Sequence, residues 1–150
     1  MHTLVVTASL SSGVGRVTRG MATSVALIEE ILTIEHISSE TTLSIGDIEF
    51  YGSKEYGPFP NHQFRVSVRP SIGFAALNYM DHDDKEMPVA NSFNPRRPLP
   101  EANLIFNGVI SSMFPRTAAI PVSDARSALL EWLGTRTRPT CISWVPFDQY

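Results

Sequence analysis

The densest group of potential metal ligands in the chain is the run from Asp81 to Glu86 (DHDDKE). Carboxylates and an imidazole this close together can in principle hold a divalent cation. A calcium loop of the EF-hand type would need an oxygen ligand at its fifth position and a glycine next. The chain has Lys85 and Glu86 at these positions. We therefore interpret residues 81–86 as a solvated hairpin turn, and we expect no metal ion and no cofactor.

An acidic turn can also serve as a surface for binding another protein. A loop rich in carboxylates can imitate phosphate charges and cover the basic substrate groove of an enzyme that acts on nucleic acids. Acidic residues are concentrated in this turn and in the segment 29–55, whereas residues 91–150 are richer in arginine. The candidate contacts with such a partner are Asp81, Asp83, Asp84 and Glu86, followed by Asp47, Glu49 and Glu55.

Other reactive residue types give weaker signals. Cys141, the single cysteine, would need a neighbouring histidine to act as a nucleophile, and we expect it to be a small buried residue within a strand. Arg96 and Arg97 could bind a phosphate or carboxylate, but two exposed loop cations are the better explanation. The Gly-x-Gly at residues 13–15 lacks the remaining residues of a phosphate-binding loop. These observations favour a protein without enzymatic activity. A small enzyme of unknown chemistry and a ligand-binding module are the alternatives.

The clearest secondary-structure signal is a helix near the C-terminus. Ser123 can cap its first turn, and Gly134 can end it in the left-handed conformation. Pro139 then prevents the helix from restarting and favours an extended Arg138. The helix carries one apolar stripe, because its apolar residues recur at helical spacing: Ala125, Ala128, Leu129, Trp132 and Leu133.

The remaining pattern predicts a mixed fold. A helix is expected over residues 21–34, and alternating apolar residues predict several strands. A bend is expected at Gly46, and Trp144 in the last strand should join Trp132 in the core. We therefore expect an α+β fold, with an antiparallel sheet of about five to six strands and two helices packed on it. The expected strands are 4–10, 43–51, 63–68, 74–80, 102–110 and 141–145, with loops at 11–20 and 88–100.

The C-terminal segment resembles the end of the type-one immunity protein family of bacterial polymorphic toxin systems. The family pattern is a short strand, an amphipathic helix with an aromatic residue before leucine, then Arg-Pro and a strand with tryptophan. Residues 73–86 and 102–110 resemble the central part of the family more weakly, so that the resemblance covers residues 60–147. The chain departs from the pattern at 135–137 and 93–100. The matching residues are Ile120 to Val122, Ala128, Trp132, Leu133, Gly134, Thr135, Arg138, Pro139 and Trp144.

The resemblance implies a function as an immunity protein. Several family members are encoded beside toxins of the deaminase superfamily and inhibit them. It therefore implies that the chain binds a cognate toxin, a nucleic-acid deaminase, and neutralises it by blocking its active site or substrate groove. Trp132, Gly134, Arg138, Pro139 and Trp144 would have structural roles in such a protein.

Composition limits the alternatives further. A length of 150 residues, 43% hydrophobic and 18% charged, fits one soluble globular domain spanning residues 1–150, with residues 1–20 either an edge strand or disordered. A net charge of only −3 argues against non-specific binding of nucleic acid. One cysteine excludes an internal disulfide, and no segment has the length and hydrophobicity of a membrane span. We expect a cytoplasmic protein, monomeric or in a 1:1 complex with its toxin, that contacts neither nucleic acid nor membrane.

Overall fold

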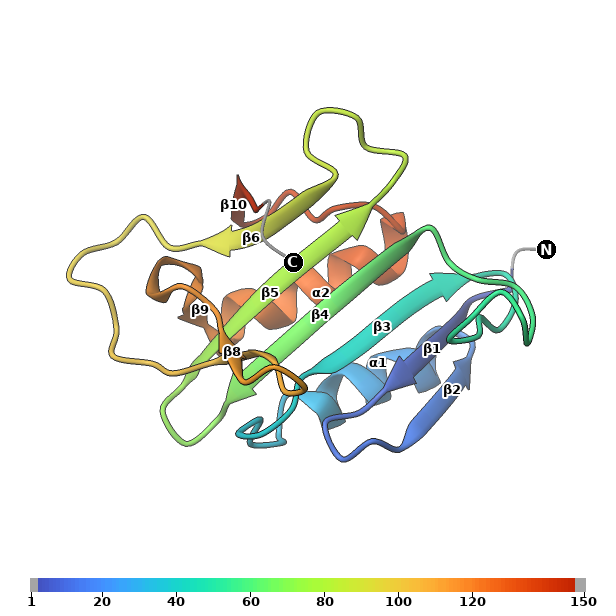
Figure 1. The fold of residues 1–150 in the computed structure, drawn as a ribbon, viewed down its shortest axis with the longest axis horizontal. Helices are drawn as coiled ribbons and strands as arrows, with labels where there is room; N and C mark the ends of the chain where they lie inside the picture. The colour runs from blue at the N-terminus through green and yellow to red at the C-terminus, as the bar shows by residue number, and fades with distance from the viewer. Residues whose placement is uncertain (1–2, 148–150) are drawn as a thin grey trace.

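A mostly antiparallel β-sheet backed by two helices forms the fold (Figure 1). The structure, a computed structural model, describes residues 3–147. The eight strands of the main sheet follow the order β10-β6-β5-β4-β3-β1-β2, and the short β9 pairs with β5. They are β1 (Val5–Ser9), β2 (Gly15–Arg19), β3 (Thr41–Gly46), β4 (His62–Arg69), β5 (Phe74–Asp81), β6 (Val89–Phe93), β9 (Ile120–Pro121) and β10 (Ser143–Pro146).

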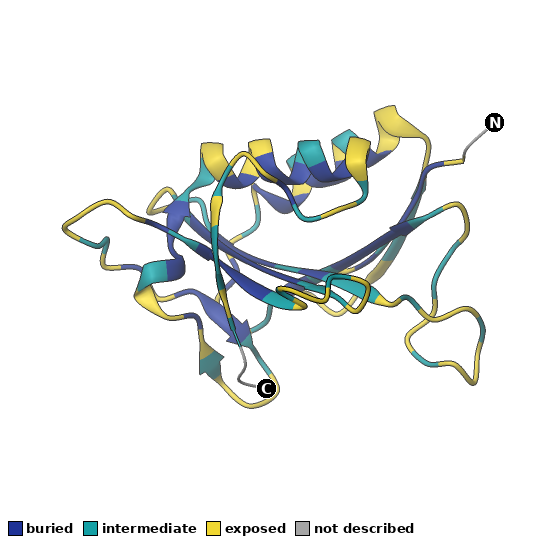
Figure 2. Cartoon of the chain, turned by 90° about the horizontal axis from the view of Figure 1, so that it is seen from above, coloured by how far each residue is buried: buried dark blue, intermediate teal, exposed yellow. Residues whose placement is uncertain are grey.

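Both helices cover the same face of the sheet. Helix α1 (Met21–Ile31) lies behind β1 and β3, and α2 (Val122–Thr135) lies behind β4 and β5 (Figure 1). Seen from above, their outer surfaces are exposed and their inner surfaces are buried against the strands (Figure 2). The apolar stripe predicted for α2 is confirmed, because its five residues are the buried residues of the helix. Burial of this stripe is what fixes the helix on the sheet.

Phe64 of β4 occupies the centre of this helix–sheet core. Its ring makes edge contacts with Tyr79 and Trp132, at centroid distances of 5.0 Å and 5.2 Å, and lies 6.2 Å from Trp144. Trp132 is fully buried, whereas Trp144 is half-buried and its indole N–H donates to the carbonyl of Pro139 at 2.7 Å. Both tryptophans therefore join the last helix and strand to the middle of the sheet.

A second, smaller apolar cluster covers part of the opposite face. A two-stranded sheet of β7 (Ile105–Asn107) and β8 (Ser112–Met113) and the 3-10 helix η1 (Arg116–Ala118) lie there. Arg65 connects this layer to the main sheet, because its guanidinium bonds Glu40 at 2.9 Å and the carbonyl of Phe106 at 2.6 Å. This layer does not extend over β1 and β3.

The α+β prediction is confirmed, but the expected strand count is too small. Strand β2 lies in the segment 11–20, which the sequence predicts to be a loop. The sequence does not reveal this strand because it is a half-exposed edge strand without an alternating apolar pattern. Strand β6 lies in the segment 88–100, which the sequence predicts to be irregular. The sequence does not reveal this strand because it buries polar residues such as Asn91, which is paired with Asn78 at 2.9 Å. The strand expected over 102–110 shrinks to β7 in the separate sheet.

Three predictions about helix ends are wrong. Helix α2 begins at Val122 with no side-chain cap, so Ser123 lies inside its first turn. The left-handed residue after the helix is Arg136, with φ 58°, whereas Gly134 lies within the last helical turn. Arg136 tolerates this conformation because its side chain bonds Asp47 at 2.8 Å and the carbonyl of Thr3 at 3.1 Å. Helix α1 ends at Ile31, three residues earlier than expected.

Candidate protein-interaction site

The antiparallel order brings two acidic loops to one end of the sheet. The loop between β3 and β4 (residues 47–61) and the loop between β5 and β6 (residues 82–88) meet there. Asn61 joins them, because its carbonyl accepts from the His82 N–H at 3.0 Å and its amide donates to the Asp83 carboxylate at 2.7 Å. We call these two loops, with Asp81 at the end of β5, the acidic end. The first loop therefore contacts the second through its last residue, Asn61, whereas Glu49 earlier in the loop lies beside Arg19 of β2, at the edge of the sheet.

Two of these carboxylates shape their own loop. Asp81 accepts a hydrogen bond from the Asp83 N–H at 2.9 Å. Asp84 accepts from the Glu86 N–H at 3.1 Å and from the Met87 N–H at 3.0 Å. Aspartate side chains commonly stabilise turns in this way. The interpretation of this segment as a hairpin turn agrees with these bonds, and they leave Asp81 and Asp84 less free to contact a partner.

The turn after α2 attaches both acidic loops to the helix layer. Arg136 bonds Asp47 in the first loop, and Arg138 bonds Asp84 in the second at 2.6 Å. Arg138 also donates to the carbonyl of Met87 at 3.1 Å. The backbone N–H of Met87 and then the guanidinium of Arg138 lower the pKa of Asp84 below its usual value, which keeps the pair charged. Arg138 thus connects the second acidic loop to the turn after α2.

The other carboxylates of the acidic end remain more available. Glu55, Asp83 and Glu86 are exposed, and the side chains of Glu55 and Glu86 have no hydrogen bond or ion pair with any described residue. Glu49 is partly exposed and lies 3.7 Å from Arg19, a distance at which solvent weakens the attraction. Any electrostatic contact with a partner would therefore depend mainly on these four residues.

The loop 47–61 also presents aromatic side chains to solvent, which sequence reasoning missed. Tyr56 is 75% exposed, Phe59 50% and Tyr51 41%. The loop is held in shape because the Phe50 N–H donates to the Thr7 hydroxyl at 3.1 Å and the Tyr51 N–H donates to the carbonyl of Pro58 at 2.8 Å. Exposed aromatic residues on a supported loop are typical of protein-binding surfaces. Their grouping between glycines and prolines was the available signal.

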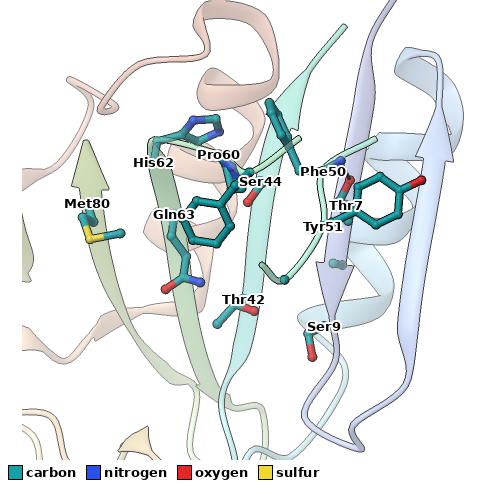
Figure 3. A pocket seen from close by; sticks show the side chains of 13 residues that line it. Thr7, Ser9, Thr42, Ser44, Phe50, Tyr51, Pro60, His62, Gln63 and Met80 are labelled. Carbon is teal, nitrogen blue, oxygen red and sulfur yellow. Dashed lines mark hydrogen bonds between the residues drawn. The ribbon is translucent and has the colours of Figure 1, made fainter. Parts of the chain in front are cut away.

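Beside this loop, a groove of about 350 Å³ lies on the sheet face that the helices leave uncovered (Figure 3). Phe50, Tyr51 and Phe59 contribute from the loop, while alternate side chains of the strands form the floor. Successive side chains of a strand point to opposite faces of the sheet. On β1, β3 and β4 the apolar residues face the helices, so the polar residues between them form the floor of the groove. The main floor residues are Thr7, Ser9, Thr42, Ser44 and Gln63.

His62 lies where the groove meets the acidic end. Its Nε2 accepts a hydrogen bond from the Ile45 N–H at 3.0 Å, and its ring packs against the edge of Phe50 at a centroid distance of 5.9 Å. Burial lowers the pKa of His62, although the carboxylates of Asp81 and Asp83 act in the opposite direction. The imidazole is therefore a neutral support for the aromatic loop at neutral pH.

The other candidate residues lie apart from this end. Cys141 is exposed between α2 and β10, so the prediction of a buried cysteine within a strand is wrong. Partial burial, followed by the adjacent Glu131 carboxylate, raises the pKa of its thiol, which disfavours the nucleophilic thiolate. Arg96 and Arg97 are exposed in the loop after β6, and Arg97 donates to backbone carbonyls there. Among residues 3–147, no three His, Cys, Asp or Glu side chains are grouped so that they could hold a metal ion.

These features define an α+β protein with a surface suited to binding another protein: a ring of carboxylates, exposed aromatics and an open groove. The chain belongs to the Imm1 family (Immunity protein Imm1), whose model matches residues 24–146. The match begins well before residue 60, so it includes most of α1, for which the sequence resemblance gave no support. Comparison with curated proteins gives no significant match. Neither helix in the described part of the chain is long and apolar enough to cross a membrane.

Proposed function

We propose that this chain binds and neutralises a cognate toxin, a deaminase that acts on nucleic-acid bases, by covering its active site or substrate groove. The match to the immunity protein family over residues 24–146 is the observation that carries this proposal. The toxin is proposed to be a deaminase because the C-terminal segment resembles family members that are encoded beside deaminase toxins. The chain forms one functional domain, acts in the cytoplasm of the producing cell and forms a 1:1 complex.

Occlusion would work through complementary charge. A protein that binds nucleic acid carries lysines and arginines along its substrate groove. The carboxylates of the acidic end can pair with them and attract the toxin over distance, which mainly raises the association rate. The proposed contacts are Glu49, Glu55, Asp83 and Glu86 first, because these are the most available. Asp47, Asp81 and Asp84 add negative charge while bonding within the chain.

Exposed aromatic residues would supply the remaining binding energy. A specific protein–protein interface typically buries about 1,600 Å² in total, and a few large, well-packed side chains dominate its energy. Tyr51, Tyr56 and Phe59 lie in the same loop as two of the proposed carboxylates. This arrangement of apolar anchors beside charged residues supports a protein as the partner.

Reversing charge at the acidic end tests this proposal. The neighbouring toxin domain is the toxin domain encoded by the reading frame beside that of this chain. In the double variant Glu55→Lys/Glu86→Lys, its association rate with the chain should fall about tenfold at low salt, and this difference from the wild type should shrink as salt screens the charges. Surface plasmon resonance at several salt concentrations measures both effects. Neither side chain has a partner among residues 3–147, so the fold should be unaffected.

A matched control changes the same amount of charge elsewhere. Asp124 lies in the first turn of α2 and Glu101 is exposed outside the acidic end. Asp124→Lys/Glu101→Lys should therefore leave association nearly unchanged. Equal losses in both double variants would refute the proposed contact surface. If the wild-type chain neither binds the toxin domain nor protects cells that co-express it, the immunity function itself is wrong.

A further inference from the structure

Several polar side chains on the floor of the groove have no partner. Ser9, Thr42, Ser44 and Gln63 make no side-chain hydrogen bond to any residue from 3 to 147. Ser44 is only 8% exposed, and its hydroxyl, which no residue from 3 to 147 bonds, keeps contact with the open groove. A ligand that displaces water from these polar groups would have to replace the hydrogen bonds of that water. The floor is therefore suited to a ligand that brings hydrogen-bond donors or acceptors.

The side wall of the groove is aromatic. Phe50, Tyr51 and Phe59 line it, and Phe50 is held by its hydrogen bond to Thr7 and by the edge contact with His62 (Figure 3). Faces of aromatic rings attract cations, and the planar guanidinium group of arginine stacks on them especially well. Met80 adds a polarisable thioether on the opposite side.

The charges around the groove favour a cation. No lysine or arginine lines it. His62, which lines the groove, donates through its Nδ1 to the side-chain oxygen of Asn61 at 3.2 Å, and Asn61 donates to the Asp83 carboxylate, so negative charge lies close to one end of the groove. Arg65, whose backbone is paired with Thr42 in the sheet, directs its guanidinium to Glu40 and over the ring of Phe106 at 4.5 Å. An anionic ligand would meet like charge at the mouth of the groove, whereas a cation would be attracted.

From these observations we infer that the groove receives an arginine side chain from a protruding loop of the toxin. The guanidinium would stack against the aromatic wall and donate hydrogen bonds to the hydroxyls and the Gln63 carbonyl on the floor. A volume of about 350 Å³ lies at the low end of the range for ligand sites, and an arginine side chain still attached to its own backbone can enter it from the open side. This inference rests on the proposed immunity function and assigns the partner group that the uncovered sheet face recognises.

Substitution of Gln63 by residues of opposite charge tests the inference. Gln63→Glu places a carboxylate where the guanidinium would lie and should tighten binding of the neighbouring toxin domain several-fold. Gln63→Lys places a competing cation there and should weaken binding by at least tenfold. A purely structural role for Gln63 would make both substitutions weaken binding. Ser127→Glu and Ser127→Lys, on the exposed face of α2, control for overall charge and should change affinity by less than twofold.

A second variant covers the case in which a charged floor residue disturbs folding. Thr42→Val keeps the shape of the side chain and removes its hydroxyl, and it should weaken binding about fivefold while the melting temperature stays unchanged. On the toxin, each exposed arginine can be replaced by lysine in turn. At one position, the change in binding free energy should not add to the change caused by Gln63→Glu. Wild-type affinity in all groove variants, with the cells still protected, would overturn the inference but leave the immunity function intact. Absence of any binding by the wild-type chain would instead overturn the immunity function.

Discussion

Individual residues at the acidic end divide between holding the fold and facing solvent. Asp84 and Asp47 are bonded to Arg138 and Arg136, whereas Glu55 and Glu86 have no such bonds within residues 3–147. The sequence could identify all of these carboxylates as a charged group but could not separate them. The two arginines lie 54 and 89 positions away from their partners, and only the fold brings them together. Residue types alone therefore overestimate how much negative charge a partner would meet.

Three carboxylates that accept backbone hydrogen bonds should make the protein sensitive to acid. A hydrogen bond from a backbone N–H group is the largest cause that lowers the pKa of each carboxyl. The Ser71 N–H lowers the pKa of Glu35 below its usual value of 4.5, and the Met87 N–H lowers that of Asp84 below 3.8. The Thr140 N–H lowers the pKa of Glu131 below 4.5. Each carboxyl thus binds its proton less tightly in the folded chain than in the unfolded chain. The stabilisation is present above these usual values and is lost as the pH falls through the lowered folded-state pKa values.

Urea denaturation between about pH 3 and about pH 7 measures this dependence. The free energy of unfolding should begin to fall below about pH 6.5, because burial lowers the pKa of His36 and His62 and the unfolded chain binds protons there more readily. It should fall further below about pH 5, as the three carboxyls are protonated. The variants Asp84→Asn and Glu131→Gln should each lower the free energy at neutral pH by about 1 kcal/mol and make its decline in acid shallower. Glu55→Gln, at an unpaired residue, should leave the curve unchanged. A decline equally steep in all three variants would contradict the assignment.

At the scale of elements, strands and helices were predictable where burial is one-sided and apolar. The stripe of α2 and the alternation at the start of β4 appear directly in the sequence, because one face of each meets the core, and β5 appears as a continuous apolar run that is buried on both faces. Strand β6 was missed because Asn91 and Ser92 are buried and their polar groups are paired, which hides the pattern. The groove was missed because its hydroxyls become a surface only when β1 and β3 pair.

The corrected end of α2 gives a prediction about glycines. Gly134 lies in the last helical turn, and a Cβ atom there would meet nothing within 4 Å. Gly134→Ala should therefore raise the free energy of unfolding by about 0.5–1 kcal/mol, because alanine has the higher helix propensity.

Gly73, in the turn between β4 and β5, is the matched control. A Cβ atom there is equally uncrowded, but its φ of +78° is unfavourable for an alanine. Gly73→Ala should lower the free energy of unfolding by about 1 kcal/mol. Thermal or urea denaturation compares the two variants. A destabilised Gly134→Ala protein would mean that the glycine is needed to end the helix, as its sequence position suggested.

At the scale of the whole molecule, the two faces of the sheet have different tasks. The helices and the large core occupy one face, and Arg136 and Arg138 connect that layer to the acidic loops. The opposite face keeps an open groove beside exposed aromatic residues. A packed layer that supports loops with binding residues is a common arrangement in binding proteins. Family membership identifies the kind of partner, and this division of faces indicates where the partner would lie.

Hydrogen–deuterium exchange of the chain, alone and in complex with the neighbouring toxin domain, tests this account most directly. The account predicts that toxin binding slows exchange in residues 42–61 and 81–88, which form the groove, the aromatic loop and the acidic end. Slower exchange confined to other exposed segments, such as residues 94–103 and 107–113, with the acidic end unchanged, would contradict it.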